Sequence, residues 1–205
     1  SENFGAWTAN SGTLTQSAGD WIWTSDSGTN GYLQMPIERT ANDVAVYAVE
    51  AKIEASRWLY FGPGGSGHWF DLENGVTYNA PSSSAFAASV SPSSRSGYMW
   101  CVVARITGEP ASTITNIRVY GLATAPTTNS LGSGTNNGTT SITIRRAFYG
   151  RNRTAFAEAD YNKTTATLPT WATDGNYSVQ ESESARPTLV GTALMMSSGD
   201  SMTVV

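Results

Sequence analysis

"RSGYMWCVVARIT", residues 95–107, reads as a β-strand that is apolar on both of its faces. Successive side chains of a strand point to opposite sides, so Trp100 and Val102 share one face while Cys101 and Val103 share the other. A strand with two apolar faces lies inside a sheet that is covered on both sides. We therefore expect a central strand here, with Trp100 in a core and Cys101 as a small buried apolar residue.

Strand-like runs of this kind recur along most of the sequence, and the periodicity of an amphipathic helix is nearly absent. Clusters such as "SDSGTNG", "GPGGSG" and "SPSSRSG" separate the runs. Short strands punctuated by Gly, Ser, Asn and Pro are typical of a β-sandwich or a β-barrel. The expected strands cover residues 20–24, 32–36, 44–53, 58–61, 68–72, 76–78, 85–90, 98–107, 113–122 and 141–148.

The organisation of the chain follows from where these runs lie. The run "VAVYAVEAKIEA", residues 44–55, begins apolar on both faces, and we expect it to emerge into solvent from Glu50 onward. After Tyr149 the sequence becomes more charged and less periodic. We predict one β domain over residues 1–150 and a C-terminal extension over residues 151–205, which either wraps the domain or pairs with a neighbouring copy.

Composition excludes several classes of partner. The chain has 205 residues and a formal net charge of −4, so it lacks the basic surface that binding to nucleic acid needs. A local exception is the cluster Arg145, Arg146, Arg151 and Arg153, which we interpret as a patch that flanks a turn; the alternative is a contact with an anionic glycan, a partner or nucleic acid. The single cysteine excludes an intrachain disulfide and a Cys-rich zinc site. The sequence contains no apolar run long enough to predict insertion into a membrane. We expect neither a metal nor a cofactor.

Four segments carry a resemblance to a known family: "NFGAWTANSGTLT", "FDLENG", "SGYMWCVVARIT" and "GTTSITIRRAFYG". They resemble the jelly-roll domain, similar to carbohydrate-binding modules, of bacteriophage tail-fibre and other virion proteins. In that family a core strand begins with Gly-Trp-Tyr-Arg-Cys, and this chain has Gly97, Tyr98, Met99, Trp100 and Cys101 there. The resemblance implies an all-β antiparallel sandwich (a jelly roll) at a virion surface outside the cell. It also implies a homo-oligomer, such as a trimer, with other virion proteins as partners.

The best candidate for a ligand site is "RWLYFGPGGSGHWFDLENG", residues 57–75. Sugar rings present flat C–H faces that stack on aromatic rings, and sugar hydroxyls bind carboxylates, amides or Arg. The alternative is that the aromatic residues of this segment fill the core between two sheets. The candidate glycan-binding residues are Arg57, Trp58, Tyr60, His68, Trp69, Asp71, Glu73 and Asn74.

Catalysis is not expected from these residues. Asp71 and Glu73 share one strand face and point in parallel, whereas a glycosidase needs its two carboxyl groups on opposite sides of the scissile bond. Cys101 and His68 lie far apart in the sequence and do not suggest a nucleophile with its base.

The predicted function is therefore a non-enzymatic surface protein of a phage virion that binds host or environmental glycans. It would be a component of a tail fibre, of a head fibre or of the capsid decoration. Two alternatives stay open. One is a purely structural virion protein that stabilises the capsid or tail, and the other is a carbohydrate-binding module of a secreted polysaccharide-degrading enzyme.

Overall fold

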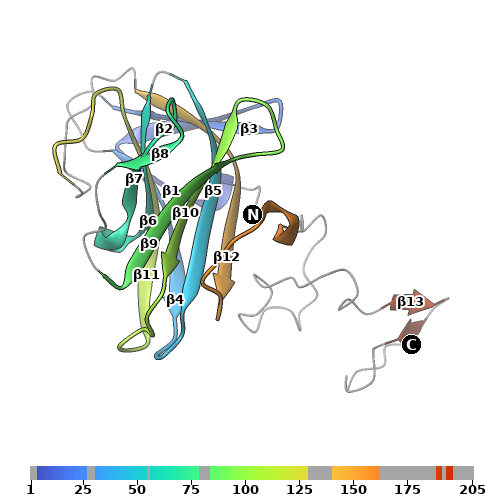
Figure 1. Cartoon of the computed structure of the whole chain (residues 1–205). Helices are drawn as coiled ribbons and strands as arrows, with labels where there is room; N and C mark the ends of the chain where they lie inside the picture. Colours follow the sequence, from blue (N-terminus) through green and yellow to red (C-terminus); the bar gives the residue numbers. More distant parts are fainter. Residues whose placement is uncertain are drawn as a thin grey trace.

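The computed structural model describes residues 4–26, 31–54, 56–78, 84–128 and 140–161, together with the backbone of two short strands near the C-terminus. The main body consists of two antiparallel sheets of six strands each that pack against each other (Figure 1). The predicted all-β antiparallel sandwich is thus confirmed. Its winding as a jelly roll stays a prediction.

The two sheets are named A and B here. Sheet A has the order β1 (Thr8–Asn10), β4 (Tyr32–Arg39), β11 (Thr113–Leu122), β6 (Trp58–Pro63), β7 (His68–Asp71) and β8 (Val76–Tyr78). Sheet B has the order β2 (Gly12–Ser17), β3 (Asp20–Ser25), β12 (Ser141–Arg151), β5 (Ala45–Ile53), β10 (Tyr98–Arg105) and β9 (Phe86–Pro92). Within the described residues, short 3₁₀ helices lie at Phe4–Ala6, Gly64–Ser66 and Glu158–Asp160. Near the C-terminus β13 (Thr188–Val190) pairs with β14 (Ala193–Met195).

The core between the sheets is built from alternate residues of the central strands. Val49 of β5 lies opposite Cys101 of β10, and both are fully buried. Leu59 and Phe61 of β6 belong to the same buried cluster from the side of sheet A. The thiol of Cys101 is inaccessible, and burial raises its pKa far above the usual range. Cys101 is therefore the buried apolar residue that the sequence predicted.

Strand β10 is interior to sheet B, as expected, because it pairs with β5 on one side and with β9 on the other. Trp100 is fully buried, but it lies on the outer face of sheet B rather than between the sheets. It packs there with Val46, Ala48 and Phe148 in a second cluster. The prediction of a buried Trp100 is confirmed, and the core that it occupies is a separate one.

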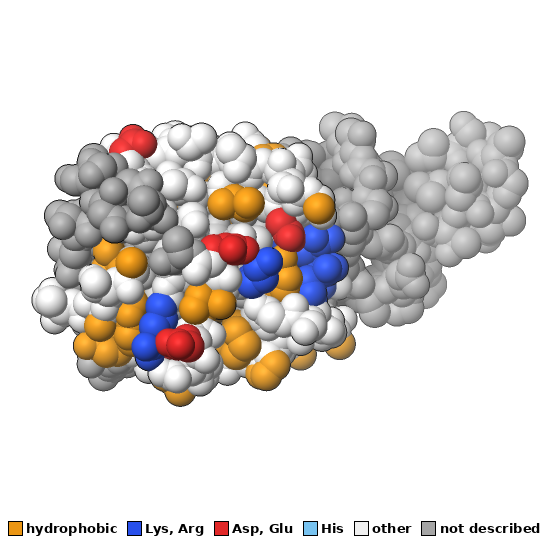
Figure 2. Space-filling model, turned by 90° about the horizontal axis from the view of Figure 1, so that it is seen from above, with side chains coloured by type: hydrophobic (Ala, Val, Ile, Leu, Met, Phe, Trp, Pro, Cys, Tyr) orange, Lys and Arg blue, Asp and Glu red, His pale blue; other side chains and the backbone are white. Residues whose placement is uncertain are grey.

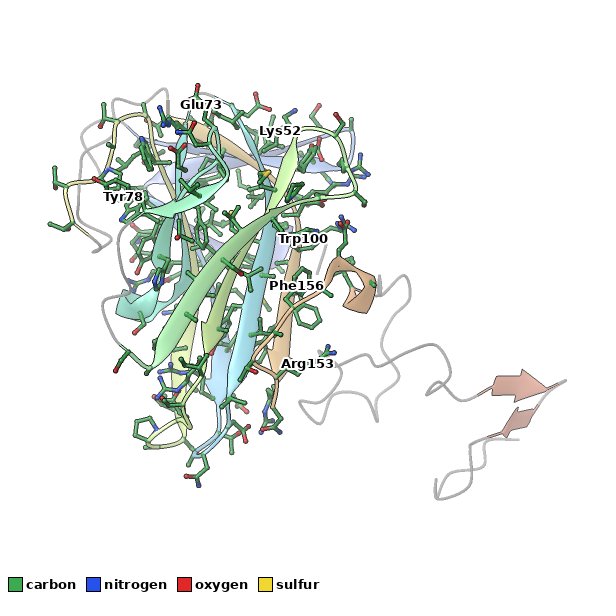
Figure 3. The ribbon with its side chains drawn as sticks, in the orientation of Figure 1. Lys52, Glu73, Tyr78, Trp100, Arg153 and Phe156 are labelled. Atoms are coloured by element: carbon green, nitrogen blue, oxygen red, sulfur yellow. The ribbon has the colours of Figure 1, made fainter. Side chains whose placement is uncertain are left out.

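Residues 152–161, which we call the strap, cover this outer face of sheet B. The chain turns after β12 at Asn152, whose φ is +56° and whose N–H donates to the carbonyl oxygen of Val44 at 2.8 Å. Phe156 then packs on Trp100, with ring centroids 4.6 Å apart (Figure 3). The ring centroid of Tyr161 lies 5.8 Å from that of Trp100. Residues 152–161 thus pack on the sandwich, while residues 162–187 lie outside the described part and the predicted division of the chain at residue 150 stays a prediction.

An ion-pair network holds the strap on sheet B and shows that the expected exposure of Glu50 was wrong. Glu50 is fully buried rather than emerging into solvent, because both its oxygens bind the guanidinium of Arg146 at 2.6 Å. The same guanidinium contacts Glu158 of the strap at 2.5 Å.

Arg151 and Arg153 flank the turn at Asn152, as expected of the arginine cluster, whereas Arg145 and Arg146 lie within β12. Arg145 and Arg151 also meet carboxylates, those of Asp20 at 2.7 Å and Asp43 at 2.6 Å. At the end of the sandwich seen in Figure 2, basic and acidic side chains lie next to one another in the same way.

Candidate functional site

The outer face of sheet A carries most of the aromatic residues proposed for the ligand site. Trp58 and Tyr60 alternate along β6 with Leu59 and Phe61, which belong to the inter-sheet core. Trp58 and Tyr60 therefore point away from that core, into a separate buried cluster. Trp58 and Tyr60 therefore do not fill the space between the two sheets, which was the alternative.

These aromatics form a row that crosses four strands. Tyr120 of β11 lies opposite Tyr60 of β6, Tyr60 lies opposite Trp69 of β7, and Trp69 lies opposite Tyr78 of β8. The ring centroids are 5.5 Å apart for Trp69 and Tyr120 and 5.3 Å apart for Trp69 and Tyr60, with the rings edge to face. Trp58 meets Tyr78 at 4.9 Å in the same manner. We call Tyr120, Tyr60, Trp69 and Tyr78 the aromatic row.

Burial divides this surface into inaccessible and accessible parts. Tyr60, Trp69 and Tyr120 are fully buried. The hydroxyl of Tyr60 donates to the carbonyl oxygen of Gly64 at 3.1 Å and accepts from the N–H of Gly67 at 3.0 Å. A ligand in solvent therefore does not reach the middle of the row.

The accessible end is formed by the strand ends around Trp58. Tyr78 is partly exposed, and Trp58 keeps 7% of its surface exposed. The guanidinium carbon of Arg57 lies 5.0 Å from the centre of the Trp58 ring, while Glu73 and Asn74 are exposed beside it. These five residues are called the Trp58 rim. Figure 3 shows Glu73 and Tyr78 on the side of the molecule away from Trp100.

Asp71 fixes the positions of the polar residues of the Trp58 rim through hydrogen bonds. It accepts Arg57 Nε at 2.8 Å and Arg57 Nη2 at 2.6 Å, so the guanidinium is held in a bidentate pair. Its oxygens also accept the backbone N–H groups of Glu73 and Asn74 and the side-chain amide of Asn74. The hydrogen bonds from Arg57 hold the pKa of Asp71 below its usual range. Asp71 is thus a positioning residue, because its acceptor capacity is already used within the protein.

Glu73 also binds Arg57, with Oε2 2.8 Å from Nη1. Asp71 and Glu73 therefore share one guanidinium instead of flanking a space for a glycosidic bond. A group of three or more His, Cys, Asp and Glu side chains that could hold a metal ion is not found among the described residues. Within the same residues, no helix is long and apolar enough to cross a membrane.

His68 does not belong to this surface. It lies opposite Phe61 in the β6–β7 pair and is 3% exposed, on the side of the sheet opposite to Trp69. Neither ring nitrogen has a hydrogen-bond partner, and burial lowers the pKa of the imidazole. The structure therefore separates His68 from the other candidate residues.

Sequence reasoning missed Tyr78 and Tyr120 as members of the surface. Both residues alternate with inward-facing neighbours in runs that were predicted to be strands. The missing information was the order of strands in the sheet, since only this order shows that β8, β7, β6 and β11 are neighbours.

No model of a protein family matches this sequence, and no curated protein matches it. The family resemblance therefore rests on the short motifs quoted above, and the function has to be argued from the site.

Proposed function

We propose that this protein is a non-enzymatic β-sandwich of a phage particle surface that binds glycans at the outer face of sheet A. The observation that carries the proposal is the Trp58 rim. There an indole, a guanidinium stacked on it and two exposed polar side chains meet at the solvent-facing end of an aromatic row.

The chemistry of the rim suits a sugar. The partly exposed ring of Tyr78 and the exposed margin of the Trp58 ring offer apolar area to the C–H face of a pyranose, and Glu73 and Asn74 offer hydrogen-bond partners for its hydroxyls. One such shallow site binds weakly, but several copies on one particle gain avidity without any new contact. An oligomer on a virion surface, which the family resemblance implies, would provide such copies.

Two groups that could serve in nucleophilic catalysis are held away from solvent. The thiol of Cys101 lies in the inter-sheet core with a raised pKa, and the imidazole of His68 is buried with a lowered one. A thiol needs a low pKa and access to its substrate in order to react. Their placement supports a binding role for the protein.

The test is a glycan-array screen of the full chain, run with Trp58→Ala and with Ile114→Ala as the matched control. Ile114 is 69% exposed and lies at the opposite end of β11 from Leu122, the residue that pairs with Trp58, so its replacement removes exposed apolar surface far from the rim. We expect the Trp58 variant to lose at least tenfold in binding while its urea unfolding midpoint shows that it is folded, and the Ile114 variant to bind normally. Equal binding by both variants would overturn the assignment of the rim.

A second function is favoured by one observation, the complete burial of Tyr60, Trp69 and Tyr120 within the chain itself. Rings that are already covered stabilise the fold, as expected of a purely structural virion protein. Failure of the intact chain to bind any glycan on the array would support this function instead.

A further inference from the structure

Arg118 is unusual among the arginines of this protein. It lies on β11, is only partly exposed, and its Nε has no hydrogen-bond partner. Within the described part of the chain its side chain makes no ion pair or hydrogen bond; the guanidinium lies over the ring of Tyr32, and its charge also acts on the phenol of Tyr60. The arginines that do have carboxylate partners are Arg39, Arg57, Arg105, Arg145, Arg146 and Arg151.

The neighbours of Arg118 on the outer face of sheet A are complementary to a sugar. Gln34 of β4 lies directly opposite Arg118, and its Oε1 is also buried without a hydrogen-bond partner. Tyr32 stands two residues along β4 on the same face, and the guanidinium carbon lies 4.7 Å from the centre of its ring. On the other side, Arg118 faces Gly62, which has no side chain. We call Tyr32, Gln34 and Arg118 the Arg118 cluster.

The three residues of the Arg118 cluster are partly exposed, and their neighbours toward the edge of the sheet are exposed. Thr8 and Asn10 of the short edge strand β1 lie opposite Gln34 and Tyr32, and both are exposed. Glu38 lies on the same face of β4, but four residues from Gln34, which is about 13 Å along a strand. Among the described residues, no carboxylate on this sheet face therefore neutralises the guanidinium.

A partly buried guanidinium without a hydrogen-bond or ion-pair partner is costly, because the contact with the ring of Tyr32 does not replace the hydrogen bonds to water that it has lost. A site of this kind is explained when a ligand supplies the missing group. The guanidinium matches the planar geometry of a carboxylate with two parallel hydrogen bonds. The oxygen of Gln34 would accept from a hydroxyl, and the ring of Tyr32 offers a face for stacking.

We propose that Tyr32, Gln34 and Arg118 form a subsite for a carboxylate-bearing sugar, such as a uronic or sialic acid residue of a glycan. The inference rests on the proposed function and specifies its substrate class as acidic glycans. Gly62, opposite Arg118, lies four residues from Trp58 along β6, or about 13 Å. One oligosaccharide can therefore extend from the Trp58 rim to the Arg118 cluster.

The experiment compares acidic glycans with neutral ones on the full chain. The array carries uronate-containing and sialylated glycans, their carboxyl-reduced neutral counterparts, and sulfated glycans. Wild type is run beside Arg118→Gln, Arg118→Lys and Arg95→Gln. Arg95 is the matched control, because it is exposed near the start of β10 on the other sheet and its substitution removes the same charge.

We expect wild type to bind carboxylate glycans at least tenfold more tightly than the carboxyl-reduced counterparts. Arg118→Gln should abolish that preference, Arg118→Lys should keep part of it, and Arg95→Gln should leave it unchanged. Arg118→Gln should also unfold at the same or a higher urea concentration than wild type, since it removes an unpaired charge.

The outcomes separate the two proposals. Binding of neutral or only sulfated glycans, or a carboxylate preference that survives Arg118→Gln, would overturn the subsite and leave glycan binding intact. Absence of all glycan binding by wild type would overturn both.

Discussion

Replacing Arg146 with Met should destabilise this protein more than replacing any exposed arginine, because Arg146 neutralises a buried carboxylate. Glu50 is fully buried, and both its oxygens bind Arg146 at 2.6 Å, with a further hydrogen bond from Ser93. The guanidinium also stacks on Trp100 at 4.8 Å and binds Glu158. Methionine keeps an unbranched apolar side chain at this position and removes the charge.

The expected magnitude follows from the burial of Glu50. Removing one partner of a buried ion pair leaves an uncompensated charge and costs about 3–5 kcal/mol. For a chain of this size, each kcal/mol lowers the melting temperature by about 2–4 °C, so the loss is about 6–20 °C. Both quantities can be measured by urea and thermal unfolding followed by tryptophan fluorescence.

The matched control is Arg145→Met, its neighbour on β12. The ion pair of Arg145 with Asp20 is more exposed, at 23% and 21%, so its loss should cost about 1 kcal/mol or less. The double variant Glu50→Gln with Arg146→Met should recover much of the stability, because no buried charge is left unpaired. An Arg146 variant no less stable than the Arg145 variant would refute the reasoning.

Three further predictions concern pH and the rim. Burial lowers the pKa of His68, the single histidine of the chain. The buried neutral imidazole therefore contributes its full stability above about pH 6.5, and this contribution is lost as the pH falls further. Urea midpoints at pH 7.5 and 5.5 should differ for wild type and coincide for His68→Leu. Burial alone would raise the pKa of Glu158, but hydrogen bonds from Ser94 and Arg146 outweigh it and lower the pKa to about 2. The strap should therefore loosen as the pH falls from about 4.3 toward 2, measured as a change in Trp100 fluorescence that Glu158→Gln shows already at pH 7. Asp71→Ala should lower the free energy of unfolding in urea by about 1–3 kcal/mol, because Arg57 and two backbone N–H groups lose their acceptor. An unchanged urea midpoint would contradict the role of Asp71 in positioning the rim.

The positions of most strands could be predicted because alternation of apolar and polar residues is a local signal. The run at 113–122 became β11 with the same bounds, and the run at 58–61 became β6 with two more residues. Strands β1 and β2 were missed, since "TANSGTLTQS" is polar and both strands are largely exposed at sheet edges. Polar edge strands have little apolar periodicity to detect.

The candidate site was harder to predict because its geometry depends on contacts between distant segments. The sequence showed that Trp58 and Tyr60 share a face, but which face lies outside depends on how the two sheets pack. Glu50 was expected in solvent because its partner Arg146 is 96 residues away. Arg118 lay in a correctly predicted strand, yet only the pairing of β11 with β4 brings it beside Gln34.

The central claim, that glycans bind at the outer face of sheet A, is tested most directly by ¹H–¹⁵N spectra of the tryptophan indoles. The full ¹⁵N-labelled chain would be titrated with the best-bound glycan from the array, and the Trp58 signal would be assigned with Trp58→Phe. The account predicts that the Trp58 indole signal shifts on binding, while those of Trp23 in the inter-sheet core and Trp100 under the strap stay in place. A bound glycan that leaves the Trp58 signal unmoved and shifts that of Trp100 would contradict it.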